Sequence, residues 1–80
     1  MILKPVTSEK AVKLIDLENT LLFATDRNAT KVQIKREVEY LFSVKVADVR
    51  TFIKRNEKFA YVKLNKANPA SDVASKIGMI

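Results

Sequence analysis

Two pairs of carboxylates are the side chains of this sequence best suited to acid–base chemistry: Asp16 with Glu18, and Glu37 with Glu39. Each pair is spaced i, i+2 in a segment with helical periodicity. Residues two apart on a helix do not face each other, so neither pair can flank a substrate as the two carboxylates of a glycosidase do. We expect these carboxylates to lie on solvated helix surfaces.

The residue types that support most other enzyme chemistry are missing. The 80 residues include no His, the commonest general base, and no Cys, which disulfides, thiolate nucleophiles and cysteine-ligated zinc sites require. The single glycine, Gly78, cannot form the glycine-rich loop that cradles a phosphate. We therefore predict a protein that is not an enzyme and that has no cofactor and no metal site.

Positive charge is concentrated in one part of the sequence. The formal net charge is +6, and residues 50–66 contain six basic side chains and one acidic side chain. Binding to a phosphate backbone requires such a concentration, although the same charges would also keep a solvated β-hairpin from aggregating edge to edge. We favour RNA binding. The predicted phosphate contacts are Lys4, Lys31, Lys35, Arg50, Lys54, Arg55, Lys58, Lys63 and Lys66.

The stretch EKFAYVKL, residues 57–64, adds an aromatic pattern to this charge. It matches the RNA-recognition-motif signature at positions 59–62 and departs from it at three other positions. An alternative function is therefore free-standing binding of single-stranded RNA, with Phe59 and Tyr61 stacking on bases. Against it, the first extended segment, MILKPV, has no aromatic residue to supply a second stacking motif.

Alternation along the same stretch predicts which side chains share a face of a strand. Phe59 and Tyr61 should share one face with Lys63, because successive strand residues point to opposite sides. We expect the two rings to serve packing more than base stacking, and Lys58 and Lys63 to contact phosphates. The residues expected to pack against helices are Ala60, Val62 and Leu64.

Turn residues and hydrophobic periodicity divide the single domain, residues 1–80, into seven elements. Thr7 or Ser8 can cap a first helix, and Thr30 with Gln33 forms a capping box for a second. Asn56 suits the left-handed conformation of a hairpin turn. The expected elements are an extended lead at 2–6, a helix ending near Glu18 or Asn19, a strand at 20–26, a helix at 30–42, strands at 46–55 and 59–64, and a helix at 68–78.

The last helix should have Ser71 or Asn68 as its cap and Gly78 as its stop, with Pro69 in or near its first turn. The order of elements predicts the α+β class: an antiparallel three- to four-stranded sheet with two to three helices packed on it.

No segment of the sequence is suited to a membrane or to export. The longest run of Ala, Val, Ile, Leu and Phe is Leu21 to Ala24, far shorter than the roughly 20 apolar residues of a membrane span. No apolar signal region follows Met1. We expect a cytoplasmic protein without membrane insertion.

Four motifs, taken in order, are similar to those of one family. They are KPVTSEKA at 4–11, NATKVQIKREVEYLFSVKVADV at 28–49, KFAYVKL at 58–64 and DVASKIG at 72–78. Together they resemble the universal large-subunit ribosomal protein family numbered twenty-three, in its short archaeal form. The resemblance implies a four-stranded antiparallel sheet with helices packed on it, and a structural role in the large ribosomal subunit.

The same resemblance implies partners. Members bind large-subunit ribosomal RNA at the rim of the nascent-chain exit tunnel, beside neighbouring large-subunit proteins. They also help to dock the signal recognition particle and other factors that meet the emerging chain. The implied docking residue is the Glu of the SEK motif, which is Glu9 here.

The sequence departs from the family pattern at several points. Arg50 stands where Asn is common, Asn56 where Gly is common, and Phe59 where the family has a second basic residue. A short connection, RNEK at 55–58, replaces the long loop of bacterial members. We therefore expect no loop that reaches into the tunnel.

Overall fold

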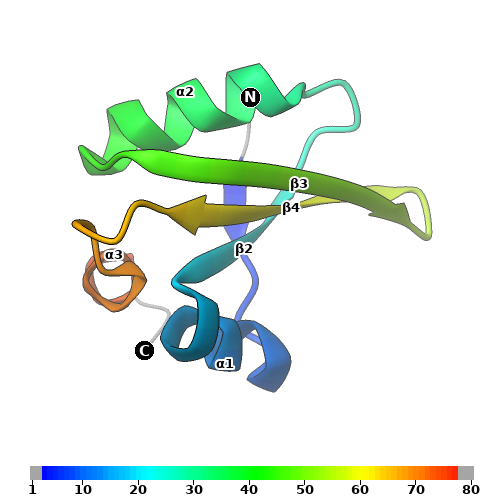
Figure 1. Ribbon diagram of the computed structural model, residues 1–80. Coiled ribbons are helices and arrows are strands. Elements are labelled where there is room, and N and C mark those ends of the chain that lie inside the picture. The colour runs from blue at the N-terminus through cyan, green and yellow to red at the C-terminus, as the bar shows by residue number, and fades with distance from the viewer. Residues whose placement is uncertain (1–2, 78–80) are drawn as a thin grey trace.

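The computed structural model describes residues 3–77 and shows an α+β fold in the predicted order of elements (Figure 1). Within that range the four strands form a single antiparallel sheet in the order β1-β2-β4-β3. The predicted fold class is therefore confirmed. The elements are β1 (Leu3–Pro5), α1 (Glu9–Glu18), β2 (Thr20–Thr25), α2 (Lys31–Phe42), β3 (Val46–Lys54), β4 (Glu57–Leu64) and α3 (Ala70–Lys76).

One face of the sheet, here called the core face, packs against helices. Leu21 of β2 lies opposite Val62 of β4, and both side chains are fully buried. Ile34 of α2 and Val73 of α3 belong to the same hydrophobic cluster. Figure 1 shows α2 running along β3, while α1 and α3 lie side by side near the start of β2. The expectation that Ala60, Val62 and Leu64 pack in this core is confirmed.

Local signals account for the first two helices. The Ser8 hydroxyl accepts a hydrogen bond from the Ala11 backbone N–H at 3.3 Å, and so caps α1. The capping box of α2 is complete, because Gln33 N–H donates to the Thr30 hydroxyl at 3.2 Å and the Gln33 side chain accepts from Thr30 N–H at 2.9 Å. These caps satisfy backbone donors that have no partner within the helix.

The hairpin between β3 and β4 is tighter than expected. Lys54 pairs with Glu57, so only Arg55 and Asn56 form the loop. Their φ angles are 53° and 64°, and a two-residue type I′ turn requires positive φ at both positions. The predicted left-handed conformation of Asn56 is confirmed. The turn holds the two strands in one register from Lys54 and Glu57 to Asp48 and Lys63, and an irregularity between Val46 and Asp48 shifts it at the far end.

The cap of α3 differs from the prediction. The residue before the helix is Pro69, and no side chain from Ser71 or Asn68 caps it. Instead the Asn19 side-chain oxygen accepts a hydrogen bond from the Ala70 backbone N–H at 2.6 Å. The sequence interpretation was wrong here because it considered only local caps. The predicted stop at Gly78 lies outside the described residues.

Asn19 is the most connected polar side chain at this end of the fold. Its Nδ2 lies within 3.2 Å of the Leu64 and Asn65 carbonyl oxygens and 3.1 Å of the Asn68 carbonyl oxygen, and donates to them. Its φ of 52° ends α1 in the left-handed conformation that Asn tolerates. One residue thus closes α1, turns the chain into β2 and holds the loop that leads into α3.

Candidate nucleic-acid interface

The other face of the sheet carries three aromatic rings that contact one another. Phe52 of β3 lies directly opposite Phe59 of β4. The ring centroids of Phe52 and Phe59 are 5.1 Å apart, and those of Phe52 and Tyr61 are 5.2 Å apart. All three side chains are half-buried. We call these residues the aromatic trio, and the face that bears them the outer face.

The aromatic trio answers the question that the sequence raised about Phe59 and Tyr61. The two residues share a face with Lys63, as predicted from the alternation of β4. They pack against Phe52 rather than standing fully exposed, yet they lie on the side away from the buried core cluster. Sequence reasoning missed Phe52 as their partner, because only the pairing register of the hairpin brings it opposite Phe59.

Basic side chains lie in the same cross-strand rows as the aromatic trio. Lys4 of β1 pairs with Ala24, which pairs with Phe59. Arg50 of β3 lies opposite Tyr61 in the next row. Directly paired residues of an antiparallel sheet project to the same side. The structure therefore brings four of the predicted contact residues to the outer face: Lys4, Arg50, Lys54 and Lys63.

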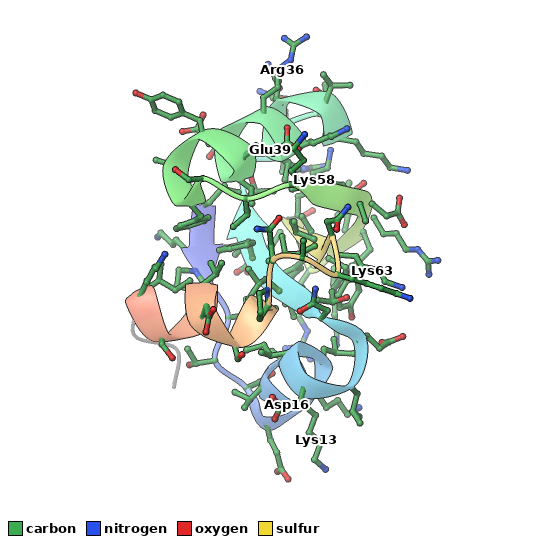
Figure 2. All side chains as sticks on the ribbon, turned by 60° about the vertical axis from the view of Figure 1, so that its left-hand side comes forward. Lys13, Asp16, Arg36, Glu39, Lys58 and Lys63 are labelled. Carbon is green, nitrogen blue, oxygen red and sulfur yellow. The ribbon has the colours of Figure 1, made fainter. Side chains whose placement is uncertain are left out.

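Lys58 points to the core face instead. Its Nζ donates a hydrogen bond to the Ala29 carbonyl oxygen at 2.6 Å, close to the start of α2. Figure 2 shows Lys58 beside α2, while Lys63 reaches out from the sheet. The two lysines were predicted as equivalent phosphate contacts, but the structure separates them. Once β4 is extended to Glu57, the period of two places Lys58 on the same face as Ala60 and Val62.

The remaining predicted basic contacts lie outside the outer face. Lys31 and Lys35 are exposed on α2, and Arg55 is in the hairpin turn. Lys66 is exposed in the loop between β4 and α3. These side chains are accessible, but α2 packs on the core face, so its lysines form a separate patch.

A hollow of about 180 Å³ lies at the end of the outer face nearest α1. The wall formed by α1 contributes Leu14 and Glu18, and Tyr61 lies among the strand residues that line it. The other lining residues are Thr20, Asp48, Arg50 and Lys63.

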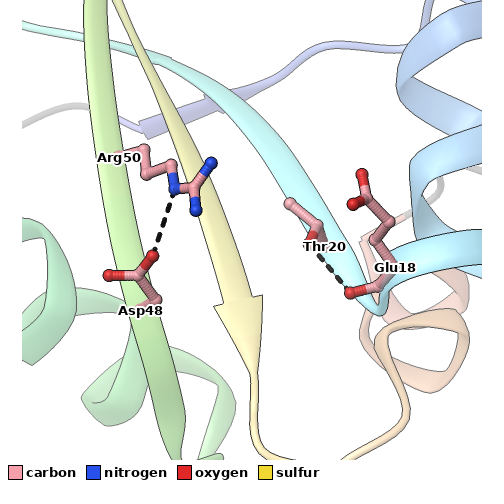
Figure 3. Close-up of polar contacts among 4 residues, drawn as sticks. All are labelled: Glu18, Thr20, Asp48 and Arg50. Carbon is pink, nitrogen blue, oxygen red and sulfur yellow. Dashed lines mark hydrogen bonds and ion pairs between the residues drawn. The ribbon is translucent and has the colours of Figure 1, made fainter.

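Two polar contacts join residues that line the hollow (Figure 3). The Arg50 Nε atom lies 3.3 Å from Asp48 Oδ2. The Thr20 hydroxyl donates to the Glu18 carbonyl oxygen at 2.9 Å. Because the Arg50 side chain is 82% exposed, we expect its ion pair to contribute no more than about 1 kcal/mol to stability. The guanidinium is oriented by Asp48 but remains accessible.

The carboxylates first considered for catalysis have ordinary structural settings. Asp16 and Glu18 are exposed, as expected. Glu37 and Glu39 are half-buried rather than solvated, and Glu39 Oε2 accepts a hydrogen bond from the Val46 backbone N–H at 3.0 Å. Among residues 3–77, no group of three or more His, Cys, Asp or Glu is placed to hold a metal ion.

Glu9, the predicted docking residue, lies in the first turn of α1. Its side chain is 85% exposed, and its carboxylate is 3.6 Å from Lys13 Nζ. This i, i+4 pair is weak at such exposure. Glu9 is therefore accessible to a partner. Over the part of the chain described, we find no helix with the length and hydropathy needed to cross a membrane.

The fold and the site together define a class: a small α+β scaffold whose helices close one face of a sheet and whose other face presents rings and cations. The amino-acid sequence matches the family model described as ribosomal protein L23 over residues 1–70. It is 49% identical, over 81 residues covering 100% of both chains, to the large ribosomal subunit protein uL23 of Pyrobaculum aerophilum. The chain belongs to the ribosomal protein L23 family. It is a structural constituent of the large ribosomal subunit, not an enzyme.

Proposed function

We propose that the chain binds large-subunit ribosomal RNA near the nascent-chain exit tunnel through its outer face. The observation that carries this proposal is the placement of Lys4, Arg50, Lys54 and Lys63 on one sheet face together with the aromatic trio. The core face is closed by helices, and on the outer face Thr20 and Leu22 of β2 are buried. The part of the outer face formed by β3 and β4 is therefore the sheet surface free to meet a partner.

Charge complementarity makes RNA the partner that fits this face. Each lysine or arginine that neutralises a phosphate releases condensed counterions, so affinity must fall steeply as salt is added. Arg55 in the turn and Lys66 in the following loop lie at the two ends of β4 and extend the footprint. Lys31 and Lys35 on α2 would contact a different RNA segment.

A charge-reversal variant tests the proposal. Lys4→Glu, Lys54→Glu and Lys63→Glu together should leave folding intact, because all three side chains are exposed. The triple variant should fail to co-sediment with large subunits, and its binding to a ribosomal RNA fragment should lose about two to three units of salt slope.

A matched control carries Lys10→Glu, Lys45→Glu and Lys76→Glu, three exposed lysines outside the outer face. It changes the net charge equally and should retain subunit binding. Normal stoichiometry of the outer-face triple variant on large subunits would overturn the proposal. Equal losses in both variants would show that total charge, rather than the outer face, governs binding.

We also propose that Glu9 forms part of the docking site for the signal recognition particle and other nascent-chain factors. The exposure of Glu9 at the start of α1 supports it. Glu9→Lys should weaken the binding of these factors to assembled ribosomes while leaving the incorporation of the chain unchanged. Asp16→Lys, which makes the same charge change at an exposed position further along α1, is the matched control. Undiminished factor binding by the Glu9 variant would refute this part of the proposal.

A free-standing single-stranded RNA binder is the alternative that the aromatic trio favours. Because the chain belongs to a family of large-subunit ribosomal proteins, we place this alternative second to binding within the large subunit. Binding of the purified chain to single strands with an affinity above that for ribosomal RNA fragments would support the alternative.

A further inference from the structure

We infer that the hollow at the end of the outer face holds one unpaired base of the bound RNA, with guanine preferred, stacked on Tyr61. This inference rests on the proposed RNA binding and assigns a particular role to one end of that surface. Three features carry it: the exposed part of the aromatic trio, the size of the hollow, and the signs of the charges around it.

The aromatic trio is an unusual surface for the solvent side of a sheet. Antiparallel sheets with one covered face alternate apolar residues inward with polar residues outward. Here Phe52, Phe59 and Tyr61 are half-buried on the outer face. Leu22 and Ala24 of β2, which lie opposite Tyr61 and Phe59, extend this apolar interruption of the outward polar set. The mutual stacking of the three rings leaves ring surface accessible, and bases stack on such rings with little dependence on sequence.

The size of the hollow limits which part of an RNA can enter it and stack on Tyr61. At about 180 Å³ it can take one flat ring system, with Leu14 of α1 as an apolar wall and Tyr61 beside it. A paired helix cannot enter a space of this size. A base that is already unpaired pays less to leave its stack than one from a duplex, so an unpaired nucleotide is the fitting occupant.

The acidic and the basic residues around the hollow suit different parts of a nucleotide. Glu18 and Asp48 line the hollow, and one Asp48 oxygen is paired with Arg50. Carboxylates repel phosphate but are acceptors for the N–H groups on a base edge. Guanine has two adjacent N–H donors on its Watson–Crick edge, which one carboxylate can accept together. Arg50 and Lys63 line the same hollow and are exposed, and they suit the flanking phosphates.

The chain offers a direct reporter for stacking. It contains two tyrosines and no tryptophan. In a Tyr40→Phe variant, Tyr61 is therefore the sole tyrosine, and Tyr40 is 83% exposed on α2, so the change leaves the outer face intact. Titration with a single strand of six uridines and one central guanosine should quench the tyrosine emission. Hexauridine, or the same strand with inosine in place of guanosine, should bind more weakly.

Affinity measurements supply the second readout. Tyr61→Leu should weaken binding of the guanosine strand about 5- to 150-fold, and Glu18→Gln with Asp48→Asn should remove the preference for guanosine over inosine. Tyr40→Leu is the matched control and should change nothing. Equal affinity of Tyr61→Leu and the native chain, with both folded by circular dichroism, would overturn the inference, as would unquenched Tyr61 emission at saturation.

These outcomes are distinguishable from failure of the proposed function. If Tyr61→Leu binds normally while the triple lysine reversal is lost from large subunits, the outer face binds RNA by charge alone and the base-holding inference fails. If the triple reversal remains on large subunits, the proposed function fails, and the Tyr61 emission still decides whether the hollow holds a base.

Discussion

The two faces of the sheet are built from alternate residues of the same strands, yet they perform different tasks. On the core face, Phe23, Ala60 and Val62 are at most 1% exposed and close against helices. On the outer face, Arg50 and Lys63 are exposed beside half-buried rings. Adjacent positions along a strand therefore govern stability and surface chemistry separately. Substitutions one residue apart should have effects of different kinds.

The largest expected effect is on the core face. Phe23 is 1% exposed and its ring stacks on Phe42 at a centroid distance of 6.2 Å. Phe23→Ala should reduce the free energy of unfolding by about 3–5 kcal/mol, measured by urea denaturation. Phe23→Leu leaves a smaller cavity and should lose less. A Phe23→Ala loss comparable to that of an outer-face substitution would remove the distinction between the faces.

Asn19 should show the next largest effect. Asn19→Ala removes the cap of α3 and the bonds to the loop after β4, and leaves Ala at a φ of 52°. We expect a loss of about 2–3 kcal/mol in unfolding free energy. Asn19→Gly also removes the side chain but tolerates this φ, so it should be about 1 kcal/mol more stable than Asn19→Ala. Identical stabilities would show that backbone strain contributes nothing at this position.

Two lysines of β4 provide the sharpest contrast between the faces. Lys58→Met removes the hydrogen bond to the Ala29 carbonyl oxygen and should reduce the unfolding free energy by about 1–2 kcal/mol. Lys63→Met should change stability by less than about 0.5 kcal/mol, but should lower the salt slope of RNA binding by about one unit. Exchange of these two results between the variants would contradict the assignment of the lysines to opposite faces.

The smallest effect is expected at the start of α1. Glu9→Gln removes a solvated i, i+4 pair with Lys13, and should reduce unfolding free energy by no more than about 0.5 kcal/mol. High salt should abolish even that difference, because exposed pairs are screened. Thermal unfolding at low and high salt measures both quantities. A larger loss that persists in salt would mean that Glu9 has a structural partner beyond Lys13.

Local signals predicted much of the fold. The capping box of Thr30 and Gln33 marked the start of α2, and alternation along β4 separated Phe59 from Ala60 correctly. Such signals depend on residues only a few positions apart, so they can be read along the chain. The family motifs, spread from residue 4 to residue 78, then indicated how the elements combine.

The features that escaped prediction depend on distant partners. Asn19 bonds to residues 45 to 51 positions away, and no local pattern distinguishes it from an ordinary helix-ending Asn. Phe52 joined the aromatic trio only through the hairpin register. Lys58 was included among the phosphate contacts because it was assigned to the RNEK connection at 55–58, whereas β4 begins at Glu57 and so includes Lys58 in the strand. The hollow forms where α1 meets three strands. No pattern along the sequence predicts this arrangement in space.

The position of β2 has a consequence for the order in which the chain can fold. β2 lies between β1 and β4, but β4 is about 40 residues further along the sequence, and the bonds of Asn19 span a similar distance. Until the hairpin has been synthesised, Leu21 and Phe23 therefore lack their cross-strand partners Val62 and Ala60. The hairpin, with its two-residue turn, is the local unit able to form early. We expect β2 and α3 to join it late, in a step limited by closure of long loops.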